Sequence, residues 1–220
     1  MASPNKPLKG ALVGAITLAL VAGVGVGLVT GVRWLTAERI AQNDETAVMA
    51  RINEMLPADA YDNDLYQDRV QMPPATIIGQ DHPFTVYRAF RDDGPPVAIL
   101  PVTANDGYHG KIHLLVAIRG DGHIQGVRVT HHRETPGLGD RIEIAKSNWI
   151  LGFNGRSLQD PKFERWRVKK DDGEFDQLTG ATITPRAVIR AVRDALVYFE
   201  RQRNTLLAQA PPDAGEERNE

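Results

Sequence analysis

Cysteine is absent from the 220-residue sequence. The chain therefore cannot form a disulfide, bind a metal through thiolates or ligate an iron–sulfur cluster with its own side chains. An excess of one charge is absent too, because 26 basic and 28 acidic residues leave a formal net charge of −2. We find no basic stripe with interleaved aromatic residues, so the composition does not indicate a nucleic-acid-binding protein.

Signatures of common catalytic and nucleotide-binding sites are also missing. There is no P-loop, no Gly-x-Ser-x-Gly nucleophile elbow and no dinucleotide fingerprint in a soluble segment, so we expect no NADH site in this chain. The histidines do not predict a metal site. His109 and His113 fall at a loop and a strand start, and the adjacent His131 and His132 would point to opposite sides of a strand. With no acidic cluster beside them, we predict no metal ion.

One long apolar run is present, since residues 10–32 contain no charged side chain. A run of this length, roughly 23 residues, can cross about 30 Å of hydrocarbon as a helix. A cleaved signal peptide usually has an apolar region of only about 7–15 residues. A soluble core helix this long rarely lacks every charge. We therefore predict a retained transmembrane helix rather than either alternative.

Glycines within this run suggest how the helix is used. Gly23, Gly27 and Gly31 are four residues apart and share one helical face. Small residues on one face allow a second helix to pack closely. The pattern favours packing against partner helices in the membrane, the alternative being a small-residue anchor that faces lipid.

Basic residues on either side of the run bear on its orientation. Lys6, Lys9 and the amino terminus precede it, whereas Arg33 and Arg39 follow it. The balance is close, and it favours a cytoplasmic tail at residues 1–9 with the long domain on the other side. In a bacterium, we expect a single-pass inner-membrane protein whose C-terminal domain is periplasmic.

Beyond the membrane span, the sequence predicts an α+β domain with a mostly antiparallel sheet and packed helices. A helix is expected at residues 34–56, stopped by Pro57, followed by an irregular linker at residues 57–83. Four strands are expected at residues 84–90, 97–102, 112–118 and 123–130. The last two are joined by a hairpin turn at Gly120-Asp121-Gly122. A short helix and a further strand are expected at residues 142–150 and 165–169.

A long final helix is expected to begin with Thr184 as its N-cap and Pro185 in the first helical position. Apolar residues recur three and four positions apart, at Val188, Ala191, Val192, Ala195 and Phe199. One face of this helix should therefore pack on the sheet. We divide the chain into a membrane-proximal helix and linker at 33–83, a globular domain at 84–204 and a disordered tail at 205–220.

The most informative stretch is DQLTGAT, residues 176–182, just before this helix. A helix N-terminus has unpaired N–H groups and a partial positive charge, so it suits a phosphate. Thr182 would place a hydroxyl there, and Gly180 would let the backbone approach closely. Taken alone, the last four residues are more typical of an ordinary strand-to-helix turn, so the surrounding pattern must decide.

The full stretch resembles the Asp-x-x-(Ser/Thr)-Gly-Ala-(Thr/Ser) motif of the FMN-binding domain family. In that family a flavin transferase attaches FMN to the last hydroxyl through a phosphoester. The resemblance implies that Thr182 carries covalent FMN. It also implies that the transferase reads the segment containing Asp176, Thr179, Gly180 and Ala181.

Two other stretches resemble motifs of the same family. HRETPGLG, residues 132–139, is similar to its His-x-Glu-Thr-Pro-Gly-Leu-Gly loop, although alone it would equally fit a connecting loop. Together with the downstream motif, it leads us to expect flavin contacts from Glu134, Thr135, Gly137 and Leu138. GYHGKI, residues 107–112, resembles a stretch that leads into a strand, and we assign it mainly to structure.

The resemblance extends from the apolar run to about Asn204, and it is most similar to the G subunits of Rnf (Rsx) electron-transport complexes. The C subunits of sodium-pumping NADH:quinone reductases are the related alternative. The resemblance implies an electron-carrying redox subunit, not a stand-alone catalyst, in a complex that couples ferredoxin–NAD redox exchange to ion movement. Implied partners are the other subunits, the flavin transferase and membrane lipid. A flavin-binding sensor or scaffold, or an anchor without flavin, are alternatives of another class.

Overall fold

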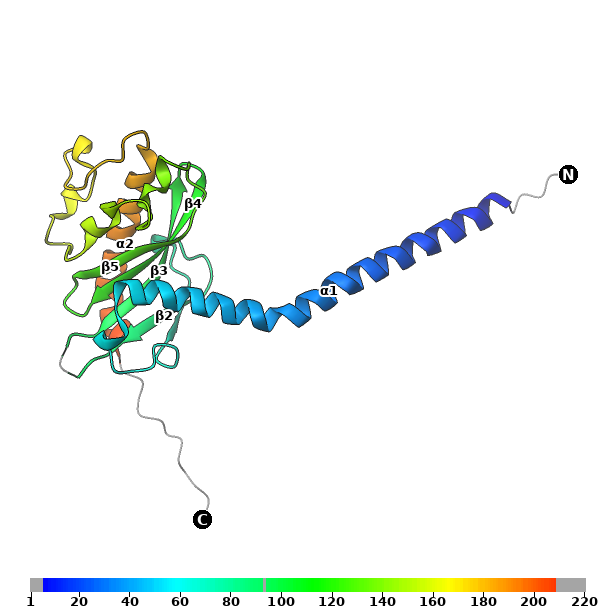
Figure 1. Ribbon diagram of the computed structural model, residues 1–220, viewed down its shortest axis with the longest axis horizontal. Helices are drawn as coiled ribbons and strands as arrows, with labels where there is room; N and C mark the ends of the chain where they lie inside the picture. The colour runs from blue at the N-terminus through cyan, green and yellow to red at the C-terminus, as the bar shows by residue number, and fades with distance from the viewer. Residues whose placement is uncertain (1–5, 93, 209–220) are drawn as a thin grey trace, which may run out of the picture. The chain divides into compact units, whose positions relative to one another are not determined.

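The computed structural model describes residues 6–92 and 94–208 (Figure 1). The chain divides into two compact units, Met1–Val48 and Met49–Glu220. Part of the predicted N-terminal tail and most of the tail predicted at residues 205–220 lie outside the described residues.

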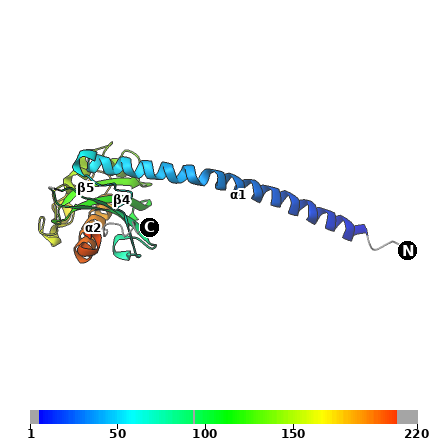
Figure 2. The same ribbon diagram turned by 90° about the horizontal axis from the view of Figure 1, so that it is seen from below.

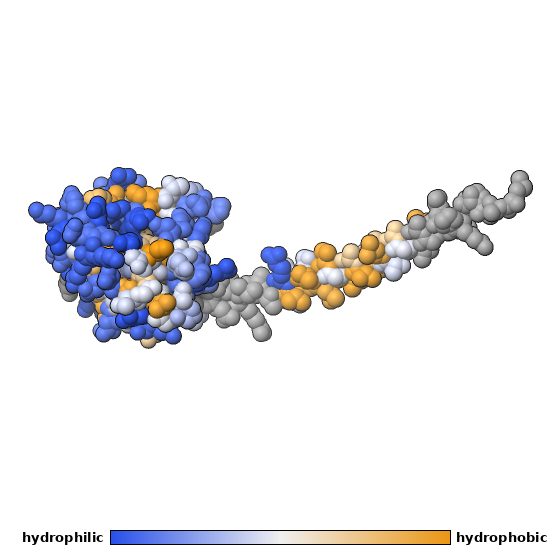
Figure 3. All heavy atoms as spheres, turned by 90° about the horizontal axis from the view of Figure 1, so that it is seen from above, coloured by the Kyte–Doolittle hydropathy of each residue, from blue (hydrophilic) through white to orange (hydrophobic). Residues whose placement is uncertain are grey.

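The first unit is helical. Helix α1 spans Lys6–Met55, and its segment Gly14–Trp34 is long and apolar enough to cross a membrane. None of that segment is buried, unlike the core helix of a soluble domain, and it presents an apolar surface (Figure 3). The end of α1 at Met55, shortly before Pro57, confirms the helix expected at residues 34–56.

The second unit contains one antiparallel sheet with the strand order β1-β2-β3-β4-β5. Each strand pairs with its neighbour in sequence, which confirms the mostly antiparallel sheet. The strands are β1 (Val70–Met72), β2 (Phe84–Ala89), β3 (Val97–Gly107), β4 (Gly110–Arg119) and β5 (Ile124–His131). The predicted hairpin turn joins β4 to β5.

Strand β1 corrects the prediction that residues 57–83 form an irregular linker. Val70 pairs with Val86 of β2, and the Met72 side chain is buried. Earlier in the segment, the Asn63 amide donates to the carbonyl of Arg88 at 2.9 Å, and Asn63 Oδ1 accepts the N–H of Phe90 at 2.7 Å. The segment is thus fixed to the sheet by long-range bonds that a three-residue strand barely signals in sequence.

Short 3₁₀ turns, rather than the predicted helix and strand, fill the region after β5. They are η3 (Gly139–Ile142), η4 (Asn148–Phe153), η5 (Phe163–Arg165) and η6 (Lys169–Asp171). The strand predicted at residues 165–169 is wrong, because only Val168 forms an isolated bridge, to Phe175. Trp166 and Val168 are buried while Arg167 is exposed, so an irregular segment reproduces the alternation expected of a strand.

Helix α2, Ile183–Leu207, lies against one face of the sheet, and its predicted apolar stripe is entirely buried (Figure 2). On the other face, Arg128 of β5 bonds Glu54, and Gly126 lies against Met55, so that residues 49–55 of α1 cover this side. The predicted N-cap is wrong by two residues: Thr182 is the N-cap of α2, and Thr184 is buried inside the first turn.

Candidate functional site

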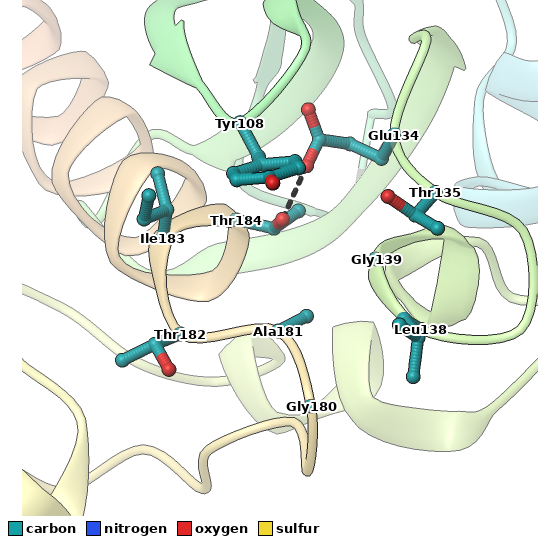
Figure 4. Close-up of a pocket in the computed structure, with 10 residues that line it drawn as sticks. All are labelled: Tyr108, Glu134, Thr135, Leu138, Gly139, Gly180, Ala181, Thr182, Ile183 and Thr184. Carbon is teal, nitrogen blue, oxygen red and sulfur yellow. Dashed lines mark hydrogen bonds between the residues drawn. The ribbon is translucent and has the colours of Figure 1, made fainter.

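A cavity of about 370 Å³ lies at the N-terminus of α2, between the β3–β4 hairpin and the loop that follows β5 (Figure 4). This volume is within the range of roughly 300–1,000 Å³ that is usual for small-ligand sites. Its lining residues are Tyr108, Glu134, Thr135, Leu138, Gly139, Gly180, Ala181, Thr182, Ile183 and Thr184. Residues from three separate stretches of sequence therefore meet around one hollow.

Both motifs singled out in the sequence contribute to this cavity. Among the predicted site residues, its lining contains Glu134, Thr135, Leu138, Gly180, Ala181 and Thr182. Gly137, Thr179 and Asp176 are not part of the lining. Asp176 points elsewhere: its carboxylate pairs with Lys169 Nζ at 2.6 Å and is 72% exposed. The predicted site residues therefore fall into two groups: six that line the cavity, and three that lie on the surface outside its lining.

The backbone before α2 makes a tight turn that depends on Gly180. The N–H of Ala181 donates to the carbonyl of Leu178 at 3.0 Å, and Gly180 has a φ of 83°. A Cβ at this position would lie 2.7 Å from Cδ2 of Leu138, which belongs to the other motif. The left-handed conformation therefore favours glycine, and a larger residue would also require the Leu138 side chain to move.

Thr182 ends this turn with an exposed side chain. As the N-cap of α2 it makes no capping hydrogen bond to the helix, which is described along its whole length. The first turn of α2 contains no acidic residue. In Figure 4 the Thr182 side chain points away from Glu134. An accessible hydroxyl beside an uncapped helix N-terminus suits a phosphate, because amide N–H groups and the helix dipole both favour an anion.

The structure also adds residues that the sequence prediction missed. Tyr108, Gly139, Ile183 and Thr184 line the cavity, although Tyr108 belongs to a stretch assigned mainly to structure. Its motif GYHGKI was a usable signal, but only the turn from β3 into β4 brings Tyr108 to the cavity. Tyr108, Leu138 and Ile183 are 61%, 41% and 46% exposed and form an apolar rim. Such a rim suits a flat aromatic ring.

A second hollow, of about 400 Å³, is lined by Arg167 and three arginines of α2. Arg186 binds Asp171 through two bonds, of 2.6 and 2.7 Å, and this hydrogen bonding lowers the pKa of the Asp171 carboxyl and raises that of the guanidinium. Arg190 and Arg193 likewise pair with acidic neighbours. Because these charges are largely balanced, this hollow is a weaker anion site than the N-terminus of α2.

Comparison with known proteins agrees with this geometry. Residues 107–197 match the FMN-binding domain family, and residues 6–55 match the RnfG N-terminal region. The chain therefore contains an FMN-binding domain, joined to an apolar N-terminal helix.

Individual relatives define the family more narrowly. The chain is 48% identical to the G subunit of the ion-translocating oxidoreductase complex of Pseudomonas aeruginosa, over 88% of this chain and 91% of the relative. The corresponding G subunit of Shewanella loihica is 45% identical over the same shares. That of Vibrio cholerae is 41% identical over 91% of this chain and 96% of the relative. The chain belongs to the family of G subunits of ion-translocating oxidoreductase complexes, which confirms the resemblance seen in the sequence.

Proposed function

We propose that this protein is the FMN-carrying subunit of a membrane-bound, ion-translocating oxidoreductase complex of the Rnf type. The observation that carries the proposal is the meeting of DQLTGAT and HRETPGLG at one cavity, in a chain that belongs to the G-subunit family. The RnfG N-terminal match favours this assignment over the C subunit of the related quinone reductases. FMN supplies the capacity to accept and donate electrons, and the chain binds and orients it.

The attachment point in this proposal is the hydroxyl of Thr182, through a phosphoester. Its support is the exposed side chain at the uncapped start of α2. Amides of the first turn of α2 would hold the phosphate, and the rim made by Tyr108, Leu138 and Ile183 would receive the ring. Thr135 and Gly137 belong to the loop that borders the ring.

Recognition by a flavin transferase follows from what the attachment loop displays. Asp176, Thr179 and Gly180 are all exposed, so an enzyme can read them without unfolding the domain. Asp176 and Thr179 lie outside the cavity lining, whereas Gly180 is part of it. In this proposal, the two residues outside the lining serve recognition by the transferase and do not bind the flavin.

Membrane placement completes the proposal. Residues 10–32 cross the inner membrane, and the domain at 84–204, together with the remaining turn of α2, lies in the periplasm. A side chain added at Gly23, Gly27 or Gly31 would meet no other atom of the described chain within 4 Å, which leaves this face open to helices of partner subunits or to lipid. Within residues 33–83, the continuation of α1 leads from the span to the domain, and the later part of the segment, with β1, belongs to the domain.

Flavin fluorescence of the denatured protein tests the attachment. Wild-type chain and Thr182→Ser, produced in cells with an active transferase, should fluoresce in denaturing gels, whereas Thr182→Ala should be dark. Fluorescent Thr182→Ala would move the attachment elsewhere. Purification from native membranes tests the assembly: a complex subunit should bring several polytopic proteins with it, whereas a flavin sensor or scaffold should come alone.

A further inference from the structure

Glu134 is a buried carboxylate whose two oxygens serve different parts of the chain. The residue as a whole is only 4% exposed. Oε1 accepts the backbone N–H of His109 at 3.0 Å, and Oε2 accepts the hydroxyl of Thr184 (Figure 4). One side chain therefore connects the β3–β4 hairpin to the first turn of α2, over 25 and 50 residues of sequence.

The backbone of Glu134 is held as well. Its N–H donates to Nδ1 of His132 at 3.0 Å, and Nε2 of His132 lies 2.7 Å from Oε1 of Glu143. Because Nδ1 accepts in this network, the ring proton is assigned to Nε2, where it is donated to Glu143. The loop is thus held at His132 as well as by the Glu134 carboxylate.

Two glycines leave the space that this carboxylate fills. A Cβ at Gly107 would lie 2.4 Å from the carbonyl oxygen of Gly110 and 2.9 Å from Glu134 Oε1, and a Cβ at Gly139 would lie 2.9 Å from Glu134 Cβ and 3.1 Å from Oε2. Gly107 ends β3, and Gly139 is the last residue of the loop at 132–139 and the first of η3. Gly139 therefore leaves room for the Glu134 side chain, and Gly107 leaves room both for the hairpin turn and for the carboxylate, so a larger residue at Gly139 would push the carboxylate out of place.

We propose that Glu134 is a positioning residue that clamps three walls of the cavity: the hairpin at 107–110, the loop at 132–139 and the start of α2. The proposal rests on the proposed binding of FMN, since the clamp sets the width of the slot that Tyr108 and Leu138 border. Both oxygens of Glu134 are already engaged by the chain, so this positioning role is distinct from the flavin contact expected from the sequence and does not exclude it.

The amide of His109 reports on the clamp directly. Hydrogen bonds to a carboxylate contribute more than neutral ones, and His109 is an exposed residue, so removal of the acceptor opens its amide to exchange with water. In Glu134→Ala, prepared without the transferase, exchange of the His109 amide should accelerate roughly tenfold to a hundredfold. Glu134→Gln should keep nearly the wild-type rate, because its amide oxygen accepts from His109 and its NH₂ donates to Thr184 Oγ1.

The fluorescence anisotropy of the bound FMN tests whether loss of the clamp loosens the cavity around it. In loaded protein, the fluorescence anisotropy of FMN should fall in Glu134→Ala and return in Glu134→Gln. Thr184→Val, which removes one link and keeps the side-chain shape, should give an intermediate value and decides the matter if Glu134→Ala does not fold. Glu164→Gln, at an exposed carboxylate, is the matched control and should behave as wild type.

Two results would overturn the proposal. The first is a folded Glu134→Ala variant whose His109 exchange and flavin anisotropy are both those of wild type. If Glu134→Ala does not fold, wild-type flavin anisotropy in Thr184→Val overturns the proposal instead. The other is a Glu134→Gln variant as defective as Glu134→Ala, since the negative charge and not the linkage would then matter. Failure of the proposed function looks different: wild-type protein would contain no FMN, while His109 exchange would still respond to Glu134→Ala.

Discussion

Replacement of Gly180 should slow flavin loading through the backbone more than through side-chain contact. At a φ of 83°, an alanine pays about 1–2 kcal/mol for the left-handed conformation. The contact of its Cβ with Leu138 Cδ2 is relieved by rotation of a side chain that is 41% exposed, at a cost of roughly 0.5–1.5 kcal/mol. The backbone contribution is therefore the larger, and it lowers the population of the native turn roughly 5- to 30-fold.

The assay is a time course of flavin incorporation with limiting transferase, read by in-gel fluorescence per mole of protein. Gly180→Ala should load roughly 5- to 30-fold more slowly than wild type, and the β-branched Gly180→Val more slowly still. Leu138→Ala alone serves as the control, and melting temperatures establish that each variant is folded. Wild-type loading of Gly180→Val, or full recovery in the Gly180→Ala/Leu138→Ala double variant, would refute the reasoning.

Other perturbations test the packing, the pH response and the topology. Arg128→Ala removes hydrogen bonds of 3.0 Å to the Glu54 carboxylate and 2.7 Å to the Glu54 backbone carbonyl. It should lower the free energy of unfolding of the detergent-solubilised chain, measured by chemical denaturation, by about 2–4 kcal/mol. A loss under about 0.5 kcal/mol would contradict the packing of residues 49–55 of α1 on the sheet. Burial, together with two neighbouring basic groups, lowers the pKa of His113 below 6.5. The unfolded chain therefore binds the proton more readily, so stability should fall as the pH drops below about 6.5, and less steeply in His113→Asn. An export-dependent reporter fused after Glu220 should be active, whereas a cytoplasmic reporter signal would reverse the proposed orientation.

The sheet was largely predictable because alternating burial is a local property of sequence. Strands β2 to β5 and their hairpin were visible as apolar runs separated by turn residues. Strand β1 was missed, because its three residues gain their place from pairing with β2. The segment around Trp166 was misread for the opposite reason, since alternation also arises when an irregular loop buries every second side chain.

The cavity was predictable in its motifs but not in its walls. DQLTGAT and HRETPGLG are each an unbroken stretch of sequence, so their residues could be named before the fold was known. Tyr108 and Thr184 join the site only through tertiary contacts with other segments. Thr184 was mistaken for a helix cap because its hydroxyl suits that role, whereas the folded chain gives that hydroxyl to Glu134.

Tandem mass spectrometry of the tryptic digest tests the central claim most directly. The material is full-length protein purified from membranes of cells that contain the transferase. The proposal predicts that the peptide containing Thr182 is heavier by one FMN less one water, with fragment ions that localise the added mass to that threonine. The same peptide found consistently unmodified, or the added mass localised to another residue, would contradict the proposal.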